Sequence, residues 1–204
     1  SCRHQPTEGE ILINNIPVSR YSREEYFRMF SSVFQDIHLL PVKISEFVSA
    51  VPADKSDSAL VDKSLEMAGL KDKISSLKDG ADTPMMKDVV QNATEFSGGE
   101  KQKLMIARSI YKGGVMVVLD EPTAALDPIA ESELYHRYAD LTTDKTSFFI
   151  SHRFASTRFC DRILLLSGGR ITESGSHDEL IAKNGRYAEL YNVQAQYYKN
   201  GDMT

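Results

Sequence analysis

The stretch of residues 95–127 constrains the fold of this chain most strongly, because it joins a glycine-led helix start to an apolar strand that ends in two acids. Ser97 and Glu100 form an S-x-x-E pattern ahead of apolar residues at helical spacing, which predicts a capping box. Gly98 and Gly99 then fall in the first turn, where bare backbone N–H groups can approach an anion without a side chain in the way. The pattern therefore predicts a helix whose first turn is open to a ligand.

A buried strand is expected directly after this helix. The glycine pair at 113–114 predicts the helix end, and residues 115–119 form a Val-rich apolar run too short for a second helix, which predicts a fully buried parallel strand. Asp120 and Glu121 follow at its carboxyl end, where open α/β sheets place their chemistry. Two adjacent carboxylates are costly to desolvate unless something positive meets them. A divalent metal with a nucleotide would meet them, and a helix cap on the segment after Pro122 is the plainer alternative.

The composition is that of a globular chain with an acidic balance. The 204 residues carry 29 acidic and 24 basic side chains, a net charge of −5, which argues against a nucleic-acid surface. No apolar run approaches the roughly 20 residues that cross a bilayer, and the polar start does not resemble a signal peptide. Cys2 and Cys160 lie far apart in the sequence, which fits unpaired thiols in a reducing compartment better than a disulfide.

Short elements and an irregular helical region are expected before residue 95. Asn14 and Asn15 predict a hairpin turn between two short strands, and a strand at residues 32–34 delivers Gln35. Ser22 and Glu25 predict a capping box that opens a helix ending at Phe30. A second helix is expected to be capped by Asp57 or Ser58 and to end at Gly69. Its apolar face would consist of Leu60, Val61, Leu65 and Ala68. Residues 77–93 are broken by Gly80 and Pro84, and the Met85–Met86 pair is expected to fill core.

The carboxyl-terminal part predicts strands that alternate with helices. A strand at residues 147–150 delivers His152, and the glycine pair at 168–169 predicts a two-residue hairpin loop between strands at 162–166 and 170–173. Three helices are expected: one opened by Pro128 over residues 129–141, a short one capped by Asp178 over residues 177–181, and an amphipathic one over residues 187–198.

Five motifs, in this order, resemble the nucleotide-binding domain of ABC transporters. They are the Q-loop SVFQDIHLL, the signature FSGGEKQKL, the Walker B strand and D-loop VMVVLDEPTAALD, and the switch His of Ser151-His152-Arg153. The end GSHDELIAKNGRYAELYNVQ is similar to exporter-type subunits, in which a membrane domain precedes this domain. The resemblance implies an α/β fold, a RecA-like P-loop NTPase core over residues 1–35 and 114–204, with an α-helical subdomain carrying the Q-loop and signature over residues 36–113.

The resemblance also implies roles for single residues, with ATP and Mg²⁺ as cofactors. Asp120 would hold Mg²⁺, Glu121 would act as general base or orient the attacking water, and His152 and Gln35 would complete the γ-phosphate and metal contacts. The residues Ser97, Gly98, Gly99, Glu100 and Asp127 would act across a head-to-tail dimer with a second nucleotide-binding domain. The other implied partner is a transmembrane domain, which places the parent protein on the cytoplasmic side of the cell membrane, without nucleic acid.

Three features of the sequence depart from the family pattern. Phe96 replaces the usual Leu, and Glu100 replaces the usual Gln, which adds a negative charge near a triphosphate unless its capping role turns it away. No G-x-x-x-x-G-K-[ST] occurs in the 204 residues. We therefore expect a core without its first strands and phosphate loop. Such a chain alone should bind MgATP weakly and should not hydrolyse it. We also expect exposed apolar edges at residues 147–150 and 162–166, which favour self-association by strand swapping or a rearranged strand order.

Two other functions are compatible with these motifs. The chain could be a non-hydrolysing partner that offers only its signature motif to an intact subunit. It could also be the carboxyl lobe of an ABC-type chromosome or repair ATPase, but that class needs long heptad stretches ahead of the signature, and residues 60–94 offer none. The sequence does not reveal a transported substrate.

Overall fold

The computed structural model describes residues 6–34, 37–120, 138 and 142–201. The chain divides into two compact units, residues 1–148 and 149–204. The first unit contains β1 (Leu12–Ile13), β2 (Ile16–Pro17), α1 (Arg23–Met29), β3 (Phe30–Val33), α2 (Ile44–Ser49), α3 (Ser58–Met67), α4 (Lys71–Ser75), α5 (Gly98–Lys112) and β4 (Met116–Asp120). β5 (Thr146–Ile150) crosses the unit boundary, and β6 (Ile163–Ser167), β7 (Arg170–Gly175), α7 (His177–Lys183) and α8 (Arg186–Gly201) form the second unit. Within the described residues, four short 3₁₀ helices connect these elements: Val18–Arg20, Ala53–Lys55, Gly80–Asp82 and Phe154–Phe159.

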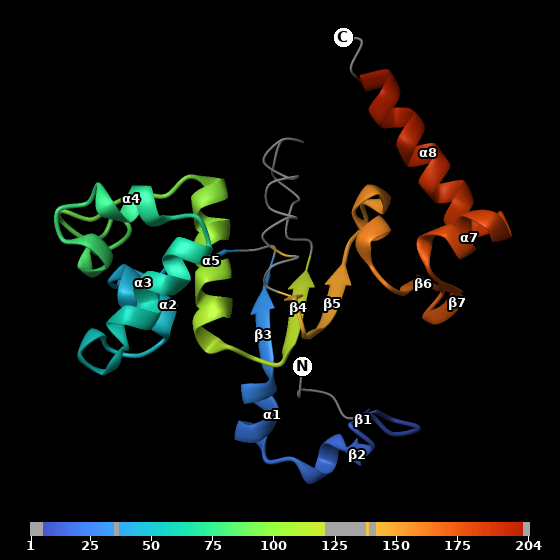
Figure 1. The fold of residues 1–204 in the computed structure, drawn as a ribbon, viewed down its shortest axis with the longest axis horizontal. Coiled ribbons are helices and arrows are strands. Elements are labelled where there is room, and N and C mark those ends of the chain that lie inside the picture. The colour runs from blue at the N-terminus through green and yellow to red at the C-terminus, as the bar shows by residue number, and fades with distance from the viewer. Residues whose placement is uncertain (1–5, 35–36, 121–137, 139–141, 202–204) are drawn as a thin grey trace. The chain divides into compact units, whose positions relative to one another are not determined.

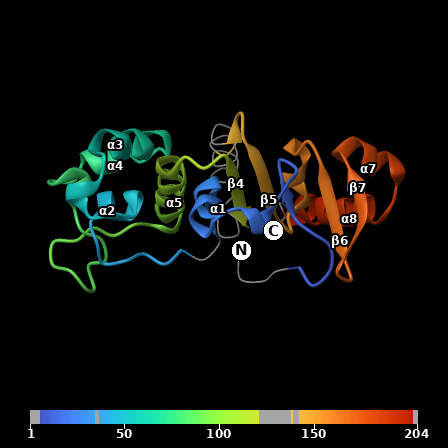
Figure 2. The same cartoon turned by 90° about the horizontal axis from the view of Figure 1, so that it is seen from below.

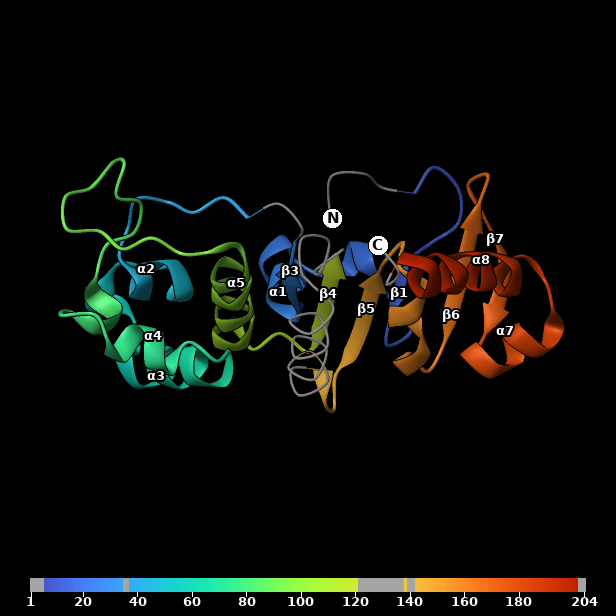
Figure 3. The same ribbon diagram turned by 90° about the horizontal axis from the view of Figure 1, so that it is seen from above.

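A three-stranded sheet in the order β3-β4-β5 lies beside α5 (Figure 1). β3 and β4 are parallel neighbours although the whole helical region α2–α5 separates them in the sequence. α5 packs against β3 on one side and against α2 and α3 on the other (Figure 3). This helix is therefore the element that joins the helical region to the sheet.

β4 is buried on one face only, so the prediction of a fully buried strand is wrong. Val117 and Leu119 are 0% and 2% exposed, and their register partners on β3, Ser31 and Val33, are equally buried. The alternate residues of β4 are half-buried, and Val115, just before the strand, is 63% exposed. Because successive side chains of a strand point to opposite faces, a continuous apolar run does not reveal that only one face is covered.

Both predicted two-residue hairpin turns are confirmed. Asn14 and Asn15 have φ angles of 51° and 62° between β1 and β2, and the glycine pair between β6 and β7 has φ angles of 56° and 73°. Two left-handed central residues are typical of the turn whose twist matches that of the flanking strands. The expected strand at residues 147–150 is also present as β5, and its Phe148 and Ile150 side chains are 52% and 51% exposed.

The helical region has a small apolar core of its own. Asp57 caps α3 by accepting a hydrogen bond from the Leu60 N–H, as predicted, and Val61 and Leu65 are buried. Leu60 itself is 37% exposed, so its assignment to the buried face is wrong, because it lies about 100° around the helix from Val61. The prediction that the Met85–Met86 pair fills core is confirmed for Met85, which is fully buried, whereas Met86 is half-buried. Among the described residues, no helix combines the length and the apolar character that a membrane span requires.

The second unit consists of the β6–β7 hairpin with α7 and α8 (Figure 2). Its core contains Ile163, Leu180 and Tyr187. The predicted cap of α7 needs a correction: Ser176, and not Asp178, is the capping residue, and it forms a capping box with Glu179. Both residues are good caps by type, and only Ser176 has the extended backbone that a cap position needs.

Candidate functional site

The first turn of α5 has the predicted capping box. The Ser97 hydroxyl accepts a hydrogen bond from the Glu100 N–H at 3.3 Å, and the Glu100 carboxylate accepts one from the Ser97 N–H at 2.8 Å. α5 runs antiparallel to β3 and β4 (Figure 1), so its first turn and the carboxyl ends of these strands face the same end of the first unit. Ser97 and Gly98 are exposed there.

Gly98 is not required by the packing of the chain itself. It does not have a positive φ, and a Cβ atom built on it would meet nothing within 4 Å. Gly114, at the other end of the helix, is the opposite case, because its Cβ would lie 2.7 Å from the Phe30 carbonyl carbon and the Ser31 nitrogen. Glycine destabilises a helix relative to alanine, so Gly98 carries a cost that no internal contact explains. The open space over its backbone fits the approach of an external group.

The backbone of this turn offers hydrogen-bond donors to such a group. The first N–H groups of a helix have no acceptor within the helix, and the helix dipole places partial positive charge there. Ser97 accepts from the Glu100 N–H, which leaves the N–H groups of the exposed Gly98 and the half-buried Gly99 at the tip of the helix. An anion, and a phosphate in particular, is the ligand that this chemistry favours.

Glu100 is held on the cap of this turn by its own contacts. Its Oε2 accepts from the Ser97 N–H, and its Oε1 lies 3.6 Å from the Lys73 ammonium of α4. Burial raises the pKa of the Glu100 carboxyl, but the hydrogen bonds with Ser97 and the charge of Lys73 outweigh it and hold that pKa below its ordinary value. Glu100 is therefore an ionised cap with a cation beside it, which confirms the expected capping role.

The sequence did not predict the contacts of Lys73 with Glu100 and Phe96. The Lys73 ammonium also lies 5.7 Å from the centroid of the Phe96 ring, and Phe96 is only 6% exposed. The two residues that depart from the family pattern, Phe96 and Glu100, thus share one cation. A long irregular segment separates Lys73 from both of them, and no local spacing rule could have paired them.

Asp120 is the last residue of β4 and is half-buried. Its partner acid Glu121, the Q-loop residue Gln35 and the D-loop residue Asp127 lie outside the described residues. Within the described part of the chain, no group of three His, Cys, Asp or Glu residues could hold a metal ion. Mg²⁺ keeps several waters and usually takes one or two carboxylates, so a partly exposed carboxylate at a strand end fits this ion.

His152 belongs to the second unit and follows β5. Its side chain is exposed, and its backbone carbonyl accepts a hydrogen bond from Gln194 Nε2 of α8 at 3.1 Å. The Gln194 Oε1 atom in turn accepts from the Phe154 N–H at 2.6 Å. One amide side chain of α8 therefore fixes the backbone on both sides of Arg153.

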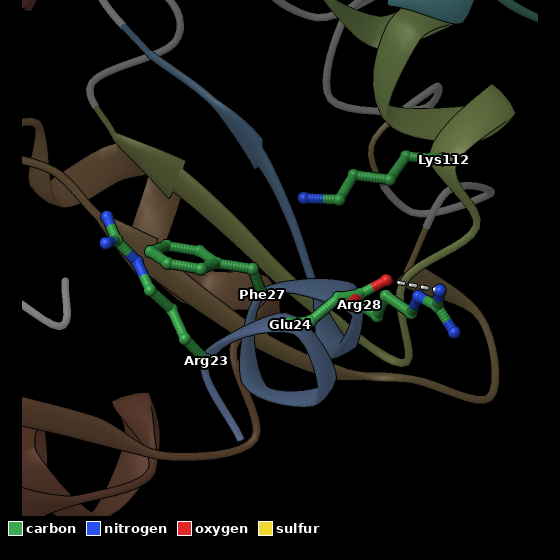
Figure 4. A pocket seen from close by; sticks show the side chains of 5 residues that line it. All are labelled: Arg23, Glu24, Phe27, Arg28 and Lys112. Carbon is green, nitrogen blue, oxygen red and sulfur yellow. Dashed lines mark hydrogen bonds and ion pairs between the residues drawn. The ribbon is translucent and has the colours of Figure 1, made fainter. Parts of the chain in front are cut away.

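A hollow near α1 contains none of the predicted site residues (Figure 4). Its lining consists of Arg23, Glu24, Phe27, Arg28 and Lys112, and its volume is about 440 Å³. Glu24 pairs with Arg28 at 2.6 Å, and the Arg23 guanidinium lies 5.5 Å from the centroid of the Phe27 ring. Arg28 and Arg23, two of the three cations that line it, thus already have partners within the chain. The first turn of α5 is therefore the stronger candidate for an anion site.

Comparisons with known proteins agree on one family. The family model described as ABC transporter matches residues 1–124. The chain is 37% identical to an ATP-dependent lipid A-core flippase of Cupriavidus metallidurans over 191 residues, 93% of this chain and 32% of the relative. It is also 37% identical to a beta-(1→2)glucan export ATP-binding/permease protein of Agrobacterium vitis over 187 residues, 92% of this chain and 31% of the relative.

A solved structure supports the same likeness. The chain matches the structure of a bacterial Atm1-family ABC exporter with ATP bound, with a TM-score of 0.81 and 32% sequence identity, over 94% of this chain and 33% of that one. The chain thus spans about a third of the length of the relatives that it matches.

Proposed function

Because this chain belongs to the ABC transporter family, we propose that it is the ATP-binding and ATP-hydrolysing segment of an exporter-type transporter, which powers transport across a membrane. The α/β fold of an ABC ATPase that the sequence predicts is confirmed by the likeness to the exporter structure. The first turn of α5 carries the proposal: it is capped, exposed and open over Gly98, and the family places a nucleotide phosphate against this turn.

The signature residues act on a nucleotide held by a second copy of the domain. Ser97, Gly98 and Gly99 present N–H groups and the positive end of α5 to the γ-phosphate, so that two domains close on two nucleotides. Asp127 communicates across that interface. Residues 36–113 form the helical subdomain of this arrangement, and residues 1–35 and 114–204 form the core.

The remaining site residues serve the attack of water on the γ-phosphoryl group. Glu121 accepts the proton of the attacking water or orients it, while Gln35 and His152 position the water and the terminal phosphate. Asp120 holds Mg²⁺, which neutralises phosphate charge when it is bound. The described position of Asp120 at the carboxyl end of a parallel strand supports this assignment, because ligands of open α/β sheets bind at that edge.

The proposal includes a transmembrane partner and a place in the cell. The relatives are named as a flippase and an export permease, and each is about three times as long as this chain. We therefore infer that the segment works on the cytoplasmic side of a membrane as part of a longer polypeptide, the parent transporter. Exposed apolar side chains on β5 and β6 also support self-association of the isolated segment, which concentration-dependent light scattering tests.

ATP hydrolysis by the parent transporter in detergent or nanodiscs tests the proposed function. We expect Glu121→Gln to lower kcat by about 10²-fold or more, because it removes the general base. Glu179→Gln, a conservative change in the capping box of α7, is the matched control and should leave kcat unchanged. If Glu121→Gln has no effect on hydrolysis while Gly98→Ala lowers it, the chain is a non-hydrolysing partner that offers only its signature turn. If neither change has an effect, the assignment is wrong.

A further inference from the structure

The Lys73 ammonium lies where the two departures from the family pattern meet. Its Nζ is 3.6 Å from Glu100 Oε1 and 5.7 Å from the centroid of the Phe96 ring. The Lys73 and Glu100 side chains are 33% and 28% exposed. The neighbouring pair of Lys71 and Glu66 is 64% and 56% exposed, which is ordinary for a solvated surface pair. The cation of Lys73 is thus drawn in against the turn that begins α5.

Glu100 brings a negative charge to a turn that, under the proposed function, faces a triphosphate. Its hydrogen bonds with Ser97 hold the carboxylate on the cap, so the charge cannot swing away from the turn. Like charges repel, and a partly buried charge is screened less by salt than an exposed one. The turn therefore needs a compensating cation nearby, and Lys73 supplies it.

Resting on the proposed function, we propose that Lys73 is a positioning residue for the signature turn. It cancels the charge of Glu100 and, through its contact with the Phe96 ring, holds the turn against α4 in the form that receives the γ-phosphate of a nucleotide on the second domain. A Gln in place of Glu100 brings no charge, so a chain with that residue has no such need. The charge of Lys73 is therefore needed only while Glu100 carries its negative charge.

ATPase kinetics of the parent transporter test this pairing with five variants, of which Glu100→Gln serves as the reference for the double variant. Lys73→Met should raise KM for MgATP about two- to fivefold, the range for a partly exposed ion pair, with a smaller effect on kcat. Lys73→Arg should keep KM close to that of the unchanged protein. In the Glu100→Gln background the effect of Lys73→Met on KM should become clearly smaller, because only the contact with the Phe96 ring is then lost. Lys71→Met removes a nearby lysine of the same helix and should leave KM unchanged.

Two outcomes would overturn the pairing. An equal rise of KM on Lys73→Met in both backgrounds means that Lys73 acts without Glu100, as a merely structural residue would. An unchanged KM on Lys73→Met means that the charge of Glu100 needs no balance. Both results are distinct from failure of the proposed function, which would leave hydrolysis insensitive to Glu121→Gln.

A second measurement tests the contact without any ATPase assay. In the 204-residue chain, the pKa of the Glu100 carboxyl can be followed by NMR. Lys73→Met should raise this pKa, since it removes a stabilising positive charge, whereas Lys71→Met should not change it. Equal pKa values in all three proteins would show that the ion pair does not form.

Discussion

α5 and α7 begin with the same capping box in the two different units of the chain, and only the first of them has the features of a phosphate site. In both helices the serine N–H donates to the glutamate Oε2 at 2.8 Å, and the glutamate N–H donates to the serine hydroxyl at 3.3 Å. The residues between serine and glutamate differ: two glycines in α5, and a histidine and an aspartate in α7. The cap itself is thus a device for starting a helix, and the open backbone beside it makes the α5 turn suitable for a phosphate.

The largest expected effect separates the two turns by activity. Gly98→Ala should lower ATP hydrolysis by the parent transporter by up to about 10²-fold, because small misplacements in an aligned site are costly. The same change should leave folding unharmed or stabilise the 204-residue chain by about 0.4–1 kcal/mol, since its Cβ meets nothing and φ is not positive.

His177→Ala at the equivalent position of α7 is the control for Gly98→Ala, and it should leave hydrolysis unchanged. The comparison between the turns breaks if Gly98→Ala keeps full activity, because the open backbone would then have no role. Hydrolysis rates and urea denaturation of both variants decide this.

A second glycine sharpens the comparison from the opposite direction. Gly114→Ala should destabilise the chain by about 1–3 kcal/mol, because the new Cβ would lie 2.7 Å from the backbone of Phe30 and Ser31. The urea midpoint of this variant, set against that of Gly98→Ala, measures the difference between a glycine required by packing and a glycine required by function. Equal midpoints would contradict the close approach of α5 to β3.

The capping serines should be equivalent for stability and different for activity. Ser97→Ala and Ser176→Ala should each cost about 1 kcal/mol of unfolding free energy, since each removes the hydroxyl that accepts a hydrogen bond from the glutamate N–H. Only Ser97→Ala should also reduce hydrolysis by the parent transporter. If Ser176→Ala reduces hydrolysis to the same extent, the α5 turn has no role in hydrolysis beyond the one that the α7 turn also has.

The smallest effect concerns pH. The desolvation that raises the pKa of Glu100 is outweighed by its contacts with Ser97 and Lys73, so its folded pKa lies below the unfolded value of about 4.3. Its contribution to stability is therefore fully present above that value and is lost as pH falls through the folded pKa. Glu100→Gln should flatten the loss of stability in acid, as urea midpoints between about pH 5 and pH 3 would show. An unchanged acid limb would mean that the pKa of Glu100 is not lowered on folding.

Local sequence patterns predicted where helices begin, but not which of two neighbouring residues is the cap or which face of a strand is buried. Ser97 with Glu100 was identifiable because a capping box is complete within four residues. Two neighbouring cap candidates, Ser176 and Asp178, could not be ranked by type alone, and the backbone favours Ser176. The burial of β4 on only one face depends on which elements cover the sheet, which an apolar run cannot reveal.

The candidate site divides in the same way. The residues of the signature turn and the strand-end Asp120 followed from motif spacing, and the structure gives them the expected positions on α5 and β4. Lys73 could not be predicted, because its contact with Glu100 joins α4 to the first turn of α5, and these lie far apart in the sequence. Gln35, Glu121 and Asp127 remain predictions from the family pattern.

The close approach of Gly114 to β3 fixes the carboxyl end of α5 and leaves the helix able to tilt about that end. Its carboxyl end is pinned, because the Gly114 N–H donates to the buried Ser31 hydroxyl at 2.9 Å and no side chain separates the two backbones. A helix of 15 residues is about 22 Å long, so a tilt of about 10° around this fulcrum would carry its far end through about 4 Å. The first turn, where we propose that a phosphate binds, lies at that far end, so a small rotation of the helical region would move this turn more than any other part of α5.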